Sequence, residues 1–179
     1  LMALFSFAPE TMKPTALLLN LFVAGISFYY YYKAGHFNKK LFLTFALTSI
    51  PLAFIGGSIE VDTSIYKKIL AVLLVFAILK MLNVFGKTSS KIIPVKLWQG
   101  LIAGGIIGFF SGLIGIGGGI ILTPLILLLH WGNMKEAAAV SALFIWVNSV
   151  AALAGQFSSG VELEKSAFLM VVIALIGGV

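Results

Sequence analysis

A glycine cluster interrupts a long apolar run in the stretch Gly108-Phe-Phe-Ser-Gly-Leu-Ile-Gly-Ile-Gly-Gly-Gly-Ile-Ile-Leu-Thr-Pro124. Glycine is the poorest helix former after proline, so Gly115 and residues 117–119 are expected to break any helix that passes through them. Within hydrocarbon, such a break survives only where protein or a polar cavity surrounds the freed backbone groups. The stretch therefore predicts a site inside a membrane.

The composition indicates a polytopic helical membrane protein. Hydrophobic residues make up 60% of the 179 residues, charged residues make up 10%, and the mean hydropathy is +1.11. Crossing ~30 Å of hydrocarbon takes ~20 apolar residues. Apolar runs near that length predict an all-α membrane bundle with spans, the last of them short, at residues 14–32, 41–59, 69–85, 101–129, 137–154 and 167–179.

The lysines predict how the chain is threaded. All twelve basic residues are lysines, and the loops at 33–40 and 86–100 carry several of them without any acidic residue. The loops at 60–68 and 155–166 contain acidic residues as well. By the positive-inside rule, we expect loops 33–40 and 86–100 to face the cytoplasm and the other two to face outward.

This threading requires residues 101–129 to enter and leave the membrane on the cytoplasmic side. The segment is short for two complete spans and its glycines lie at the middle. We therefore expect a re-entrant hairpin of two partial helices that meet at residues 115–119. A single long tilted helix is the alternative, and it would reverse the sidedness of the last loop.

An internal repeat indicates two halves of opposite orientation. The segment Thr15-Ala-Leu-Leu-Leu-Asn-Leu-Phe-Val-Ala-Gly-Ile-Ser27 aligns with Glu136-Ala-Ala-Ala-Val-Ser-Ala-Leu-Phe-Ile-Trp-Val-Asn148, so that Asn20 matches Ser141 and Ser27 matches Asn148. In this threading the first copy runs toward the cytoplasm and the second runs away from it, so the copies should run in opposite directions. Inverted repeats with broken helices are typical of secondary transporters. Chance similarity between two apolar helices is the alternative.

The repeat divides a single transmembrane domain, residues 1–179, into two units. We assign residues 1–92 to the first repeat and residues 93–179 to the second. The glycine turn has no counterpart ahead of the first copy, and the last apolar run is shorter than a full span. We therefore expect the sequence to be a fragment that lacks part of each repeat.

The glycine cluster and the helix after it resemble the sulfite exporter TauE/SafE family. The similarity lies in Gly112-Leu-Ile-Gly-Ile-Gly-Gly-Gly-Ile-Ile-Leu-Thr-Pro124 and Lys135-Glu-Ala-Ala-Ala-Val-Ser-Ala-Leu-Phe-Ile-Trp-Val-Asn148, and residues 14–36 look like the family's N-terminal counterpart. This resemblance implies a secondary exporter of sulfite, organosulfonates or related sulfur anions in the bacterial inner membrane. The chain departs from the family in lacking the first glycine turn.

The glycine cluster also suggests an anion site from its chemistry alone. Successive glycine N–H groups at a helix N-terminus offer hydrogen bonds and the positive end of a dipole to a small oxyanion. Neutral hydroxyl and amide side chains could add donors, although interhelical hydrogen bonding is an equal alternative for each. The expected substrate contacts are Gly115, Gly117, Gly118, Gly119, Ser141, Asn148, Ser149, Asn20 and Ser27.

Other functions find little support in the sequence. The predicted spans contain no Asp, Glu or His, so we expect no catalytic residue, no metal site, no cofactor and no enzyme activity. A membrane channel or a structural membrane subunit is the alternative to a transporter. The expected partners are the lipid bilayer and a small anion, with no nucleic acid, and a homo-oligomer is compatible with the pattern. The ladder Gly100, Gly104, Gly108 and Gly112 predicts a close helix-packing ridge.

Overall fold

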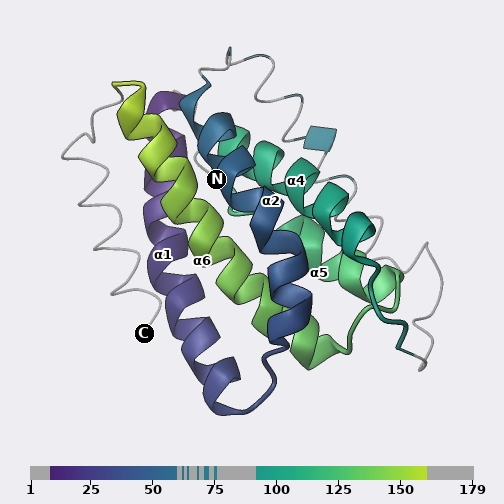
Figure 1. The fold of residues 1–179 in the computed structure, drawn as a ribbon. Coiled ribbons are helices and arrows are strands. Elements are labelled where there is room, and N and C mark those ends of the chain that lie inside the picture. Colours follow the sequence, from purple (N-terminus) through teal and green to yellow (C-terminus); the bar gives the residue numbers. More distant parts are fainter. Residues whose placement is uncertain are drawn as a thin grey trace.

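The computed structural model describes residues 9–59 and 92–160, with isolated positions between 62 and 75. The spans predicted at 69–85 and 167–179 lie wholly or mostly outside these residues. The described helices are α1 (Pro9–Lys33), α2 (Lys39–Ser58), α4 (Leu97–Ile114), α5 (Gly119–Leu128) and α6 (Met134–Ser158) (Figure 1). Four of them, α1, α2, α4 and α6, are long and apolar enough to cross a membrane. The prediction of an all-α membrane bundle is confirmed.

Local sequence signals explain where the helices end. At the end of α1, Gly35 adopts a left-handed φ of 73°. The N–H of His36 donates to the carbonyl of Tyr31 at 3.1 Å, which completes a Schellman turn. The Asn38 side chain then caps α2 by accepting from the N–H of Leu41 at 3.1 Å. At the start of α6, Asn133 and Glu136 form a reciprocal capping box.

Helices α2, α4 and α6 run in the same direction. A Cβ atom built on Gly104 of α4 would overlap Phe45 of α2, and one on Gly112 would overlap Ala53, so contacts advance along both helices together. Ala152 lies close to Gly57 near the ends of α6 and α2.

Helix α1 runs against α6, which lies between α1 and α2 (Figure 1). Leu17 packs with Ala152, whereas Gly25 lies next to Trp146, so the contacts run in opposite order along the two helices. The opposite directions predicted for the two repeat copies are therefore found in α1 and α6. The pseudo-two-fold axis between them stays a prediction.

Residues 92–133 form the predicted hairpin. The N–H of Ile93, just before α4, donates to the carbonyl of His130, just after α5, at 2.7 Å. The segment therefore enters and leaves at one end of the bundle. Its arms are unequal, however, because α4 has 18 residues and about the length of a complete span, whereas α5 has 10. The expectation of two partial helices is wrong for the first arm, which begins at Leu97.

The lysines gather at the end where the hairpin enters. We call this the lysine-rich end, and it holds Lys33, Lys39, Lys40, Lys96 and Lys135. The other end, which we call the opposite end, holds the C-terminal ends of α2, α4 and α6, where the Ser159 hydroxyl donates to the carbonyl of Ser58 at 2.8 Å. The arrangement agrees with the predicted threading, and the cytoplasmic assignment of the lysine-rich end stays a prediction.

The predicted glycine ridge is confirmed. Each of its four glycines faces α2 so closely that an added Cβ atom would overlap that helix, at Thr44, Phe45, Ser49 and Ala53 respectively. Small residues let helix backbones approach closely where no water drives their association. This ridge fixes the position of α4 against α2. It therefore also fixes the position of the helix break that follows α4.

Candidate functional site

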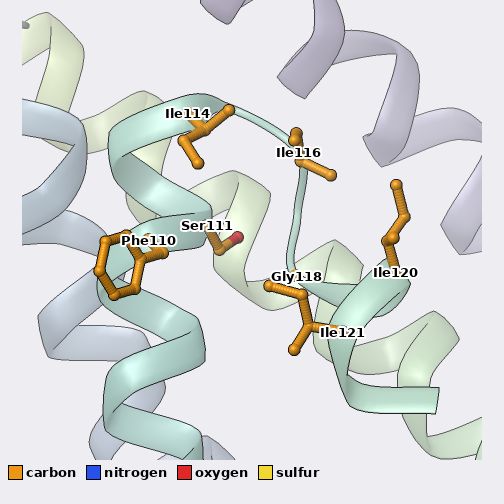
Figure 2. A pocket seen from close by; sticks show the side chains of 7 residues that line it. All are labelled: Phe110, Ser111, Ile114, Ile116, Gly118, Ile120 and Ile121. Carbon is orange, nitrogen blue, oxygen red and sulfur yellow. The ribbon is translucent and has the colours of Figure 1, made fainter. Parts of the chain in front are cut away.

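The break between α4 and α5 depends on glycine backbone conformations. Gly115, Gly117 and Gly118 have φ values of 81°, 78° and 78°, which L-residues with a side chain rarely adopt. Helix α4 ends where the Gly115 N–H donates to the carbonyl of Ser111 at 2.8 Å. The linker then passes from Ile114 through Ile116 to Gly118, where α5 begins (Figure 2). The predicted break is confirmed, and the alternative of one long helix is wrong.

The N-terminus of α5 presents backbone N–H groups that the fold leaves available. Gly118 is its N-cap, and the carbonyl of Gly118 accepts from the N–H groups of Ile121 and Leu122. Within the described part of the chain, no acceptor is paired with the N–H of Gly117, Gly118 or Gly119. These groups combine free donors with the positive end of the helix dipole, which is the arrangement that binds anions at helix N-termini.

Side chains from two other helices converge on the same turn. A Cβ atom built on Gly117 would lie 3.0 Å from Asn20 Nδ2 of α1 and 3.2 Å from Ser149 Oγ of α6. The fold thus brings together three residues that the sequence analysis selected from widely separated positions. They supply backbone, amide and hydroxyl donors around one point.

Two polar side chains of α6, Asn148 and Ser149, are buried, and each has a polar atom without a hydrogen-bond partner among the described residues. These atoms are Asn148 Oδ1 and Ser149 Oγ. The Asn148 amide donates to the carbonyl of Phe144 at 2.9 Å, which fixes its orientation. Leaving a buried polar atom unpaired costs about 1–3 kcal/mol. Ser149 Oγ, which would lie 3.2 Å from a Cβ atom built on Gly117, is therefore suited to contacting a polar ligand at the turn.

Ser111 of α4 belongs to the same neighbourhood, although the sequence analysis did not select it. Its hydroxyl is buried without a partner among the described residues, and its Cβ lies 3.3 Å from a Cβ built on Gly118. Figure 2 shows its side chain pointing from α4 toward the linker. Its position in the sequence could have identified it, because Ser111 lies four residues before Gly115. A residue one turn before the glycine that ends a helix lies on the last turn of that helix, next to the break.

Ser141 of α6 lies beside the start of α5, since a Cβ atom built on Gly119 would lie 3.7 Å from its carbonyl oxygen. The Thr123 hydroxyl donates to Ser141 Oγ at 2.7 Å, a bond that holds α5 against α6. Ser27 is half-buried two turns beyond Asn20 on α1, or about 10 Å along the helix axis. Gly115 lies at the end of the linker nearest the opposite end and packs against Lys13.

The side of the turn that faces α4 is nearly filled. A small cavity there offers about 10 Å³ to the centre of a water-sized sphere and is lined by Phe110, Ser111, Ile114, Ile116, Gly118, Ile120 and Ile121 (Figure 2). A space of this size holds at most about one water molecule. The polar side chains next to Gly117, Asn20 and Ser149, come from α1 and α6 and not from this side.

The described residues contain no group of three or more His, Cys, Asp or Glu side chains that could hold a metal ion. Glu136 is engaged in the capping box of α6 at the lysine-rich end. The two side chains that lie next to Gly117, Asn20 and Ser149, are neutral.

The whole chain matches one family of membrane proteins. The family model described as sulfite exporter TauE/SafE matches residues 1–179. The probable membrane transporter protein y4hK of Sinorhizobium fredii is 36% identical over 162 residues, which cover 88% of this chain and 66% of that protein. The probable membrane transporter protein MJ0441 of Methanocaldococcus jannaschii is 28% identical over 169 residues, which cover 90% of this chain and 62% of that protein.

The chain spans a little under two thirds of the length of these two curated relatives, at 66% and 62%. No solved structure gives a significant match to it.

Proposed function

Because this chain belongs to the sulfite exporter TauE/SafE family, we propose that the protein is a secondary transporter of small sulfur-containing anions such as sulfite or organosulfonates. The observation that carries the proposal is the turn at Gly117. Unpaired N–H groups at the start of α5 meet Asn20 and the buried Ser149 there. The described residues supply one such turn.

The chemistry of the turn fits an oxyanion better than a cation or an apolar molecule. Its groups are mainly donors, namely glycine N–H groups, an amide and hydroxyls. In a medium of low dielectric constant, fixed donors stabilise negative charge strongly. Because the donors are neutral, the anion can also leave, which a transporter requires.

The directions of α1 and α6 support an inverted-repeat transporter. Two membrane-spanning helices that run oppositely and carry polar side chains, with a broken helix beside them, are typical of inverted-repeat transporters, which work by alternating access. We therefore propose that residues 1–92 and 93–179 belong to two inverted repeats. The placement of Asn20 and Ser149 at one turn supports a site shared between them.

Transport itself can be tested in proteoliposomes that contain the full protein. We expect saturable counterflow, in which unlabelled sulfite trapped inside accelerates the entry of labelled sulfite. A channel would give a flux that does not saturate in this way, and a structural subunit would give none. Either result would reject the transporter proposal.

Replacing Ser149 with alanine is expected to separate binding from stability. The hydroxyl is buried and has no partner among the described residues, so its removal should leave the melting temperature unchanged or slightly higher. Anion affinity should fall by about 1–2 kcal/mol because the bound anion loses one donor. Isothermal titration calorimetry and thermal unfolding measure the two effects. Ser49→Ala is the matched control, since Ser49 is equally buried in α2 but bonds to the carbonyl of Ala46; equal affinities in both variants would remove Ser149 from the site.

We propose that the protein lies in the plasma membrane and that its lysine-rich end faces the cytoplasm. The protein contains no cysteine, so single cysteines report sidedness cleanly. In intact bacterial cells, Ser158→Cys at the opposite end should react with an impermeant maleimide, whereas Lys39→Cys should react only after the membrane is opened. The reverse labelling pattern would invert the orientation.

A further inference from the structure

A groove opens between α4 and α5 near the lysine-rich end. It offers about 540 Å³ to the centre of a water-sized sphere, against about 10 Å³ for the cavity beside Gly118. Ile102 and Ile106 line its α4 wall, and Leu125 and Leu129 line its α5 wall. The groove forms because α4 packs mainly against α2 whereas α5 packs against α6, which leaves space between the two arms of the hairpin.

The walls of this groove are apolar and exposed. Ile102 and Ile106 are each 55% exposed, and Leu129 is 39% exposed. The two isoleucines lie one turn apart on α4, away from the glycine ridge that faces α2. An exposed apolar groove along a membrane-spanning helix favours a hydrocarbon chain over water as its occupant.

The end of the groove nearest the lysines is polar and aromatic. Lys96, which immediately precedes α4, lines it together with Gln99 and the exposed Trp98. The described lining residues include this one lysine and no acidic residue. Lysine and tryptophan are typical of the boundary between hydrocarbon and headgroups. Lys96 makes no side-chain capping bond to α4, so the positive end of the helix dipole adds to the charge of its ammonium group.

We propose that this groove binds one anionic phospholipid, with the phosphate group next to Lys96 and one acyl chain along Ile102 and Ile106. Ile106 comes ten residues after Lys96, which corresponds to about 15 Å of helix. That length is about half of the ~30 Å hydrocarbon core, or the depth of one leaflet. A small soluble anion would match the charge at the entrance but not the apolar walls. Basic pockets between membrane helices are known to bind anionic headgroups.

The charge of the headgroup is tested by lipid binding to the full protein in detergent, measured by native mass spectrometry. The two probes are phosphatidylglycerol, which is anionic, and phosphatidylcholine with identical acyl chains. The first phosphatidylglycerol should bind about fivefold more tightly than phosphatidylcholine, which is the effect of about one lysine near the membrane surface. Lys96→Gln should remove most of this preference. Lys135→Gln should keep it, because Lys135 is exposed at the same end but does not line the groove.

The apolar walls are tested by filling the groove. Ala103→Phe fills it from a partly buried position, and Ile102→Trp fills it from an exposed one. Each should weaken the binding of both lipids by at least about tenfold, because the acyl chain loses its buried contacts. Ile102→Trp replaces no buried side chain, so it carries the test if Ala103→Phe does not fold. Ile26→Trp on α1 is the matched control, since Ile26 is 56% exposed and lies outside the groove.

Four results would overturn the lipid site. Two are unchanged lipid binding in Ile102→Trp and an unchanged preference for phosphatidylglycerol in Lys96→Gln. A dimer of the wild type that Ile102→Trp dissociates would make the groove a contact between two copies of the chain. A disulfide between Ile102→Cys and a cysteine placed in residues 69–85 would assign the groove to that segment. None of these results bears on the transport of sulfur anions, which is tested separately.

Discussion

Gly117→Ala is expected to abolish anion binding while leaving the bundle folded. The added methyl group would lie 2.7 Å from Ile145 Cγ2, 3.0 Å from Asn20 Nδ2 and 3.2 Å from Ser149 Oγ, and so would fill the point where the donors converge. Alanine also disfavours the φ of 78° by about 1–2 kcal/mol, which would turn the N–H groups away. We expect affinity for sulfite to fall at least about a hundredfold, or by about 2.7 kcal/mol.

Gly35→Ala is the matched control for that experiment. Gly35 has a similar φ of 73°, but nothing lies within 4 Å of an added Cβ atom. It should therefore lose about 1–2 kcal/mol of stability through backbone strain alone, without the overlap at Ile145, and bind sulfite like the wild type. Binding that survives in a folded Gly117→Ala variant would remove the glycine turn from the mechanism.

Gly112→Ala is expected to cause the largest loss of stability among single substitutions in the ridge. A Cβ atom there would overlap the carbonyl oxygen of Ala53 and lie 2.8 Å from the backbone nitrogen of Gly57. Backbone atoms of α2 cannot rotate away as a side chain could, so α4 must move. We expect a loss of at least about 3 kcal/mol in the free energy of unfolding, at the upper end of overpacking effects.

Thermal unfolding in detergent measures this loss, with Gly25→Ala as the comparison. An added Cβ at Gly25 would meet only the Trp146 ring, at 3.4 Å, which is an ordinary contact. That variant should stay within about 1 kcal/mol of the wild type. If both variants melt together, α4 does not depend on the ridge for its position.

The sequence contained enough to predict the relative directions of the described helices, because the glycine break and the lysine-rich loops mark where the chain turns back. The Ile93 to His130 hydrogen bond closes the hairpin that the lysines required. The unequal arms could not be foreseen. Several glycines can each end a helix, and the sequence does not show that α4 stops at Gly115 whereas α5 starts only at Gly119.

The sequence identified residues of the candidate site, but it did not show which of them lie in contact. The repeat identified Asn20, and Ser149 was among the polar residues expected to contact the substrate. Their contact with Gly117 depends on where the linker between α4 and α5 lies in the bundle. The repeat also matched Asn20 with Ser141, and Ser141 instead bonds to Thr123. Two residues that match in an internal repeat occupy equivalent positions in the two halves, and this equivalence does not place them in contact with each other.

The location of a bound anion tests the proposed site most directly. Selenite is a heavier analogue of sulfite, and its selenium atom gives an anomalous diffraction signal in crystals of the full protein. We predict a peak within hydrogen-bonding distance of the N–H groups of Gly117, Gly118 or Gly119, on the side of Asn20 and Ser149. A fully occupied peak elsewhere in the membrane-spanning region, with none at this turn, would contradict the assignment of the broken helix as the anion site.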